Sequence, residues 1–226
     1  MCGIVGTASK FPVESEHWLS SAIGTLVHRG PDGIGEWWSS DRRVGLGHTR
    51  LAVLELSPAG YQPMHLEGLS IVFNGEIYNH SDLREELSAH GFVFRSHSDT
   101  EVLLAAYAAW GQDCLTHLNG MFSFALYDAL RQRVFVARDR AGEKPLFYHL
   151  AHGTLHFSSE LKGLMANPAL PRHINPNSLD CYLAMGYVPG ERCILEGYNK
   201  LSPAHALSFD LQLGTAKVWR YWQVPD

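Results

Sequence analysis

The stretch Gly120-Met121-Phe122-Ser123-Phe124-Ala125-Leu126-Tyr127-Asp128 decides the fold of this chain. Its even-numbered positions from 122 to 126 are Phe, Phe and Leu, and the odd-numbered positions around them are mostly apolar as well. A strand formed here therefore has two apolar faces, and the Ile-Val-Phe run at 71–73 shares this property. Because such strands must be covered on both faces, we expect a central sheet between two other layers.

The strands predicted beyond this stretch are joined by short turns. Residues 133–138, 145–150 and 154–159 are strand-like, and Arg140-Ala141-Gly142 and His152-Gly153 separate them. Connections of hairpin length favour antiparallel pairing, whereas parallel strands need long crossovers. Two stacked antiparallel sheets with helices outside satisfy both constraints. The sequence thus predicts an α+β fold of four layers, αββα.

The remaining elements follow from apolar periodicity and from capping signals. Helices are predicted at Ser15–His28, 80–90, from the cap at Ser98 to Gly111, 159–166 and 176–186, and strands at 3–8, 34–38, 43–55, 69–73 and 92–94. The last forty residues alternate short strand patterns with turns. We expect a core domain over 1–165 and a C-terminal extension over 166–226.

Composition excludes several classes of protein. Hydrophobic residues make up 46% of the 226 residues and charged residues 18%, which is typical of a globular chain. The net charge of −5 disfavours nucleic acid or an anionic membrane as a partner. No apolar run approaches the roughly 20 residues that span a bilayer, and no secretory signal opens the chain.

The cysteines and histidines show no metal-binding pattern. Cys2, Cys114, Cys181 and Cys193 have no CxxC spacing, and without an export signal we interpret them as reduced thiols in the cytoplasm. The histidines at 149, 152 and 156 are interpreted as structural or solvated. HExxH, GxGxxG and the phosphate-loop motif are absent, so no metal or nucleotide site is predicted in this chain.

A cysteine directly follows the initiator methionine in Met1-Cys2-Gly3-Ile4-Val5-Gly6. If Met1 is removed, as aminopeptidases do before small residues, Cys2 carries a thiol (pKa about 8.5) and a free α-amine (pKa about 7.7–8.0). That amine can take the thiol proton, so nucleophile and general base would share one residue. The structural alternative is a small apolar residue near a chain end.

Four further polar positions each have a structural and a functional explanation. Arg50, in an otherwise apolar strand, either forms a structural ion pair or binds a carboxylate bidentately. Asn74-Gly75 is either a hairpin turn or an oxyanion hole, with one side-chain and one backbone donor. Asp99 either complements a helix dipole or accepts from a substrate ammonium, and Glu76 is either a surface residue or a second ammonium partner.

Taken together, a set of ordered motifs resembles one known family. The motifs are Met-Cys-Gly-Ile at the start, His28-Arg29-Gly30-Pro31-Asp32-Gly33, Gly47-His48-Thr49-Arg50-Leu51, Phe73-Asn74-Gly75-Glu76-Ile77-Tyr78-Asn79, Ser98-Asp99-Thr100-Glu101-Val102, the 120–128 stretch, Arg138-Asp139-Arg140, Lys144-Pro145-Leu146-Phe147-Tyr148 and Ser158-Ser159-Glu160-Leu161-Lys162. The set resembles the glutaminase domain of glutamine-hydrolysing asparagine synthetases, a class II glutamine amidotransferase. The resemblance spans nearly the whole chain and implies the N-terminal-nucleophile hydrolase fold.

The resemblance also implies a role for each matched residue. Cys2 would attack the side-chain amide of L-glutamine and release glutamate and ammonia through a thioester, without a cofactor. The implied roles are the nucleophile for Cys2, the oxyanion hole for Asn74 and Gly75, the α-carboxylate site for Arg50, the α-ammonium site for Asp99 and Glu76, and backbone and apolar contacts for Leu51, Val53 and Leu54. The 28–33 loop resembles the lid over the family's site.

The family continues into an ATP-dependent synthetase domain that these 226 residues do not contain. Residues 182–189, 200–205 and 219–222 resemble the connector toward it, and its Ser-Gly-Gly-x-Asp-Ser loop is absent here. We therefore expect the ammonia to feed a partner domain that uses aspartate, ATP and Mg. A free glutaminase, another class II amidotransferase acting on sugars, nucleotides or polysaccharides, and a non-catalytic regulatory domain are the alternatives. The oligomeric state, a homodimer included, stays open.

Overall fold

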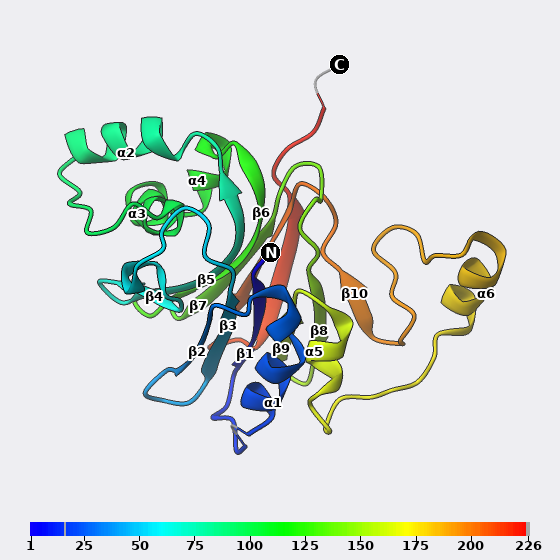
Figure 1. Ribbon diagram of the computed structural model, residues 1–226. Coiled ribbons are helices and arrows are strands. Elements are labelled where there is room, and N and C mark those ends of the chain that lie inside the picture. Colours follow the sequence, from blue (N-terminus) through cyan, green and yellow to red (C-terminus); the bar gives the residue numbers. More distant parts are fainter. Residues whose placement is uncertain (16, 225–226) are drawn as a thin grey trace.

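The computed structural model describes residues 1–15 and 17–224, and these form two stacked antiparallel sheets with helices outside (Figure 1). The first sheet has the order β10 (Tyr198–Lys200), β8 (Phe147–Ala151), β9 (Thr154–Ser158), β1 (Gly3–Ser9), β3 (Val44–Arg50) and β2 (Gly33–Trp38). The second has the order β12 (Thr215–Arg220), β11 (His205–Asp210), β7 (Arg133–Arg138), β6 (Gly120–Asp128), β5 (Leu69–Ile77) and β4 (Met64–Leu66).

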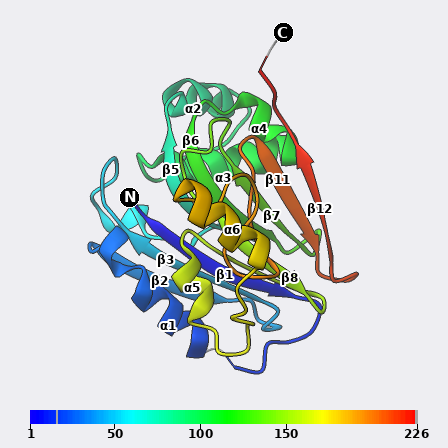
Figure 2. The same cartoon turned by 90° about the vertical axis from the view of Figure 1, so that its right-hand side faces the viewer.

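Helices cover the outer face of each sheet, as Figure 2 shows from the side. The second sheet is covered by α2 (His80–Ala89), α3 (Asp99–Trp110) and α4 (Cys114–His117), and the first by α1 (His17–Thr25) and α5 (Leu161–Met165). Helix α6 (Pro176–Met185) projects from the body. Short 3₁₀ turns lie at η1 (Val27–Arg29), η2 (Pro58–Gly60) and η3 (Gly111–Asp113).

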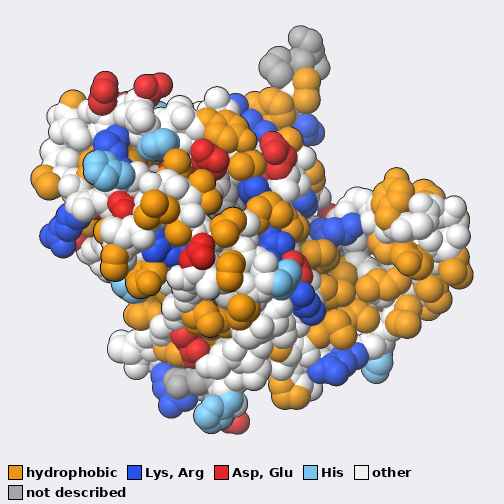
Figure 3. All heavy atoms as spheres, in the orientation of Figure 1, with side chains coloured by type: hydrophobic (Ala, Val, Ile, Leu, Met, Phe, Trp, Pro, Cys, Tyr) orange, Lys and Arg blue, Asp and Glu red, His pale blue; other side chains and the backbone are white. Residues whose placement is uncertain are grey.

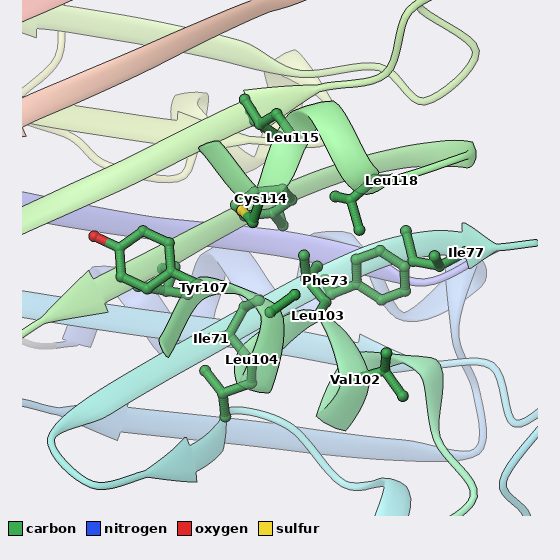
Figure 4. Packing of buried hydrophobic residues seen from close by; sticks show 14 of the residues in the cluster. Ile71, Phe73, Ile77, Val102, Leu103, Leu104, Tyr107, Cys114, Leu115 and Leu118 are labelled. Atoms are coloured by element: carbon green, nitrogen blue, oxygen red, sulfur yellow. The ribbon is translucent and has the colours of Figure 1, made fainter. Parts of the chain in front are cut away.

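Strand β5 shows why two layers must flank the second sheet. Ile71 and Phe73 face helix α3, where they pack with Leu103 (Figure 4), while Val72 faces the first sheet. Strand β6 alternates in the same way, so the prediction that 120–128 is buried on both faces is confirmed. The observed four layers also confirm the predicted αββα arrangement.

Four predicted elements differ from the structure, and the first is the strand predicted over 69–73, which continues to Ile77. The strand predicted over 43–55 ends at Arg50, because its partner β2 begins opposite that residue at Gly33. Residues 92–94 are not a strand: Phe92 and Phe94 pack onto the outer core while Val93 is 85% exposed, so anchoring of a loop produces the alternating pattern. The helix predicted over Ser15–His28 covers only His17–Thr25 and then tightens into η1; residue 16 lies outside the described part of the chain.

The last sixty residues contribute to both sheets. Strand β10 extends the first sheet, and β11 and β12 extend the second. The domain boundary at 165 stays a prediction. Hydrophobic side chains gather over α6 at the right of Figure 3, and the exposed ones there are Tyr182, Leu183, Met185 and Tyr187. No helix in the described residues is long and apolar enough to cross a bilayer.

Candidate active site

Cys2 lies at the end of the first sheet, between the start of β1 and the end of β3. The backbone of Gly3 pairs with Thr49 and donates to its hydroxyl at 3.1 Å. A side chain at position 3 would place a Cβ 2.6 Å from that same hydroxyl, so glycine fits this close approach. The Leu51 N–H, just past β3, lies 3.3 Å from the Cys2 sulfur and donates to it. The thiol is thus held by backbone geometry.

A buried arginine fixes the carbonyl of Cys2. Arg29 Nε donates to that carbonyl oxygen at 2.9 Å, and its Nη1 contacts Glu160 Oε1 at 2.8 Å. Glu160 also accepts from His28 at 3.0 Å and pairs with Lys162 at 3.2 Å. Burial opposes ionisation of Glu160, but these three donors outweigh it and lower its pKa to about 2. The matched motifs at 28–33 and 158–162 contain these residues; the resemblance implies a lid for the 28–33 loop, but it predicts no contact between Arg29 and Cys2.

Asn74 and Gly75 lie inside β5, so the hairpin-turn explanation is wrong. They pair with Ser123 and Phe122 of β6. A Cβ on Gly75 would lie 2.2 Å from the Met121 carbonyl oxygen, which explains the glycine by close backbone approach. Asn74 is 1% exposed, and neither its Oδ1 nor its Nδ2 has a hydrogen-bond partner in the described residues. Buried amides are normally satisfied, so this one is available to a ligand.

The open edge of β5 leaves one backbone donor beside Asn74. Strand β4 pairs only as far as Ile71, and side chains take over beyond it. Gln62 accepts from the N–H of Phe73 at 2.6 Å, and Asp99 accepts from that of Ile77 at 3.0 Å. Because N–H groups two residues apart point to the same edge, the Gly75 N–H lies between them. No described side chain accepts from it.

Arg50 ends β3 and is 6% exposed. Its Nη2 donates to the carbonyl of Glu55, and its guanidinium lies 4.8 Å from the ring centre of Tyr61. A Cβ on Gly60 would come within 2.6 Å of the same Nη2. No carboxylate pairs with Arg50 in the described residues, so the structural ion-pair explanation is wrong. The guanidinium keeps donors that a carboxylate can use.

Asp99 is the first residue of α3 and is 5% exposed. Ser98 caps the helix by accepting from the Thr100 N–H at 3.1 Å. The Glu101 side chain accepts from the backbone N–H groups of Arg95 and Ser96, and not from the N–H of Ser98 as in a capping box. Burial raises the pKa of Asp99, and the Ile77 N–H only partly offsets it. A cation placed beside Asp99 would favour its charged form.

All nine predicted site residues line one pocket of about 150 Å³. The lining comprises Cys2, Asn74, Gly75, Arg50, Leu51, Val53, Leu54, Glu76 and Asp99, joined by Met1, Ala52, Glu55, Gly60, Gln62, Phe73, Ser98, Thr100, Met121 and Lys144. Among the second group, sequence reasoning missed Gln62 and Lys144. Gln62 lies in none of the matched motifs, and Lys144 opens the motif at 144–148, from which no role in the site is predicted.

The electrostatics of Cys2 call for a base close to the thiol. Burial raises the thiol pKa, which the Leu51 N–H and the chain terminus partly counteract. Met1 is present in the structure, so the nitrogen of Cys2 is a peptide nitrogen and the free amine belongs to Met1. Burial lowers the pKa of that amine. An amine with a lowered pKa is neutral at lower pH and can accept a proton.

Metal ligands do not gather in this structure. The described residues contain no group of three or more His, Cys, Asp or Glu placed to hold a metal ion. All four cysteines are unpaired. His149 and His156 are buried and neighbour each other, with ring centres 6.5 Å apart. That the reaction requires no cofactor stays a prediction.

Comparison with known proteins decides the family. A family model described as "Glutamine amidotransferase domain" matches residues 1–222. The chain belongs to the class II glutamine amidotransferase domain family. It shares the N-terminal-nucleophile hydrolase fold with glutamine phosphoribosylpyrophosphate amidotransferase from B. subtilis. That structure superposes with a TM-score of 0.71 at 19% identity and covers 99% of this chain and 50% of its own.

The curated relatives of this amidotransferase domain are longer proteins. Asparagine synthetase 3 (glutamine-hydrolyzing) of Bacillus subtilis is 40% identical over 99% of this chain and 37% of its own length. A putative asparagine synthetase 2 of Methanocaldococcus jannaschii is 34% identical over 100% of this chain and 47% of its own length. "Amidase chry2" of Gibberella zeae is 36% identical over 84% of this chain and 28% of its own. The chain thus spans less than half the length of these relatives.

Proposed function

We propose that this amidotransferase domain hydrolyses the side-chain amide of L-glutamine to glutamate and ammonia. The observation that carries the proposal is the convergence of Cys2, Arg50, the Asn74–Gly75 pair and Asp99 on one pocket. None of these residues taken singly decides the function. Together they supply the nucleophile, the oxyanion donors and both ends of an amino-acid site.

The pocket can recognise the α-amino-acid end of glutamine by charge. The Arg50 guanidinium would bind the α-carboxylate through two parallel hydrogen bonds. Asp99, with Glu76 beside it on the lining, would accept from the α-ammonium. Since burial raises the Asp99 pKa, the substrate ammonium would itself stabilise the charged carboxylate. Leu51, Val53 and Leu54 would contact the substrate between these ends.

The reaction starts once Met1 has been removed. The α-amine of Cys2 takes the thiol proton, and the sulfur attacks the carbonyl carbon of the side-chain amide. The negative oxygen that forms accepts from Asn74 Nδ2 and from the Gly75 N–H. The protonated amine then gives its proton to the departing nitrogen, which leaves as ammonia. Water hydrolyses the thioester, releases glutamate and restores the thiol.

Glutamate release from glutamine by single-cysteine variants tests this function. Cys2→Ala should abolish release, because no other residue of the pocket is a thiol. Cys114→Ala is the matched control, since Cys114 is buried in the outer core behind β5. It should keep most of the activity. Equal activity of both variants would remove Cys2 from the reaction.

We further propose that the ammonia passes to an amide-forming synthetase domain that uses aspartate and ATP with Mg. The names and lengths of the relatives support this, as do the exposed apolar side chains of α6, which would suit a contact surface. A cytoplasmic location and a homodimer stay predictions.

The second candidate function is delivery of the ammonia to an acceptor other than aspartate, because one relative at 36% identity bears the name of an amidase. An assay of the whole natural protein with aspartate, ATP and glutamine separates the two. Asparagine formation supports the first candidate, whereas glutamate release without asparagine supports the second.

A further inference from the structure

Lys144 carries a buried charge that has no carboxylate partner. The residue is 5% exposed and lines the pocket with Cys2. Its Nζ lies 3.3 Å from the sulfur of Met1, and a thioether is only a weak acceptor. Within the described residues no Asp or Glu lies within ion-pairing distance of it. A lysine is rarely buried without a carboxylate partner, because burial of an unpaired charge costs free energy. We therefore look for a functional reason for its position.

The fold holds the Lys144 backbone firmly. Its N–H donates to Asp139 Oδ2 at 3.0 Å, and its carbonyl accepts from Arg138 Nε at 2.7 Å. Asp139 is fully buried, and the nearby Leu146 belongs to the core between the sheets. These bonds fix the backbone from which the ammonium reaches the pocket.

Two cations and one thiol face the amino terminus. After burial, the Cys2 thiol acts to raise the pKa of the terminal amine, while Arg29 and Lys144 act to lower it. The thiol in turn is faced by Asp99 and Arg50.

The two cations near the amine are not equivalent. Arg29 has the larger effect on the amine, and it is paired with Glu160 at 2.8 Å. In the described residues Lys144 has no carboxylate within ion-pairing distance of its ammonium, although the Asp139 carboxylate accepts from its backbone N–H at 3.0 Å.

Removal of Met1 moves the free amine to Cys2 and leaves Lys144 without its thioether contact. The old and new nitrogens are separated by three bonds, about 3 Å. The new amine therefore lies within the same group of charges. A positive neighbour disfavours the ammonium and favours the neutral amine.

We propose that Lys144 keeps the α-amine of processed Cys2 in its neutral, proton-accepting form. This inference rests on the proposed glutaminase function, since the amine is the base of that reaction. Lys144 acts through the amine and touches no reacting atom, so it is a positioning residue.

The pH profile of kcat/KM for glutamine hydrolysis tests the inference on protein whose intact mass shows that Met1 is absent. The acid limb of the natural sequence should have its midpoint below about 7.7, the ordinary value of an α-amine. Lys144→Met should move that midpoint upward by about one pH unit, because a like charge near the amine is lost. Lys144→Arg keeps the charge and should move it less than Lys144→Met does. Lys217→Met, on the exposed β12, is the surface control and should leave the profile unchanged.

Either of two results overturns the role of Lys144. One is an acid limb that stays in place in folded Lys144→Met protein, with folding checked by thermal unfolding. The other is a midpoint at or above about 7.7 in the natural sequence, which decides the matter even if Lys144→Met does not fold. Failure of the proposed function looks different: Met1-free protein of natural sequence would release no glutamate at any pH.

Discussion

At the scale of single residues, Asn74 holds a position that costs stability. Both polar atoms of its amide are buried without partners, although an unsatisfied buried group costs about 1–3 kcal/mol. The residue is nonetheless placed at the pocket beside the free Gly75 N–H. A residue that costs folding stability but lines a pocket is typical of a ligand-binding site. A substitution of Asn74 can therefore lower activity without lowering stability.

We predict that Asn74→Ala lowers kcat for glutamine hydrolysis by about 10²–10³-fold, the usual effect of losing one oxyanion donor. The KM should change little, because the amide contacts the reacting oxygen and not the amino-acid end. The melting temperature should stay the same or rise, since two unsatisfied atoms are removed. Steady-state kinetics and thermal unfolding check both parts. A variant that loses kcat and melting temperature together would make Asn74 a structural residue.

Sequence reasoning reached Cys2, Arg50 and Asn74 because each residue type has a chemistry of its own. It left each open between two explanations, since a turn and an oxyanion hole share the letters Asn-Gly. The β5–β6 register decides against the turn. Lys144 and Gln62 escaped prediction because their importance comes from burial and neighbours far along the chain. No local pattern records such contacts.

At the scale of elements, side chains accept from the backbone N–H groups of β5 beyond the point where its neighbour β4 ends. Gln62 accepts from the Phe73 N–H, and its Nε2 donates to Thr100 Oγ1 at 3.1 Å. One buried amide thus joins the strand that carries Asn74 to the helix that begins with Asp99. The geometry of the oxyanion donors and of the ammonium site depends on this link.

We predict that Gln62→Leu lowers the free energy of unfolding by about 1–3 kcal/mol, because the Phe73 N–H loses its acceptor inside the protein. Urea denaturation gives this difference, and kcat for glutamine should fall with it.

Gln112→Leu is the matched control, since Gln112 is half-buried and its Nε2 has no partner in the described residues. Its loss should destabilise the protein less. Equal losses for both variants would show that the link through Gln62 contributes nothing.

The order of elements could be predicted well because strand and helix periods are local. The error at 92–94 has a physical origin: the side chains of Phe92 and Phe94 pack onto the outer core, and this produces the alternation typical of a strand. One such contact joins Phe94 to α2: the guanidinium carbon of Arg84 lies 4.4 Å from the ring centre of Phe94. The error at 51–55 arose because apolar residues line a pocket there instead of a sheet.

At the scale of the whole molecule, buried histidines make stability depend on pH. His48 lies in β3 with 1% exposure, and burial lowers its pKa to about 3. His156 in β9 is similar: burial, and then the neighbouring His149, lower its pKa to about 3. In the unfolded chain both titrate near 6.5. Between pH 6.5 and 3 the unfolded state therefore binds more protons than the folded state, so stability falls as the pH falls.

We predict a loss of about 1.4 kcal/mol per histidine for each pH unit below 6.5. Thermal unfolding at pH 7.5 and 5.5 measures it in a window where Glu160, with its pKa of about 2, stays charged. His156→Gln should reduce the difference between the two pH values. His152→Gln, at an exposed turn, should not. A pH dependence unchanged by His156→Gln would contradict this account.

The central claim is that Cys2 is the nucleophile and that its own α-amine is the base. Glutamate release by two preparations of the same sequence, distinguished by intact mass, tests it most directly. One has lost Met1, and the other keeps it because methionine aminopeptidase was inhibited during expression. We predict turnover only in the Met1-free protein, because only there is the nitrogen of Cys2 a free α-amine. Equal turnover in the preparation that retains Met1 would contradict it.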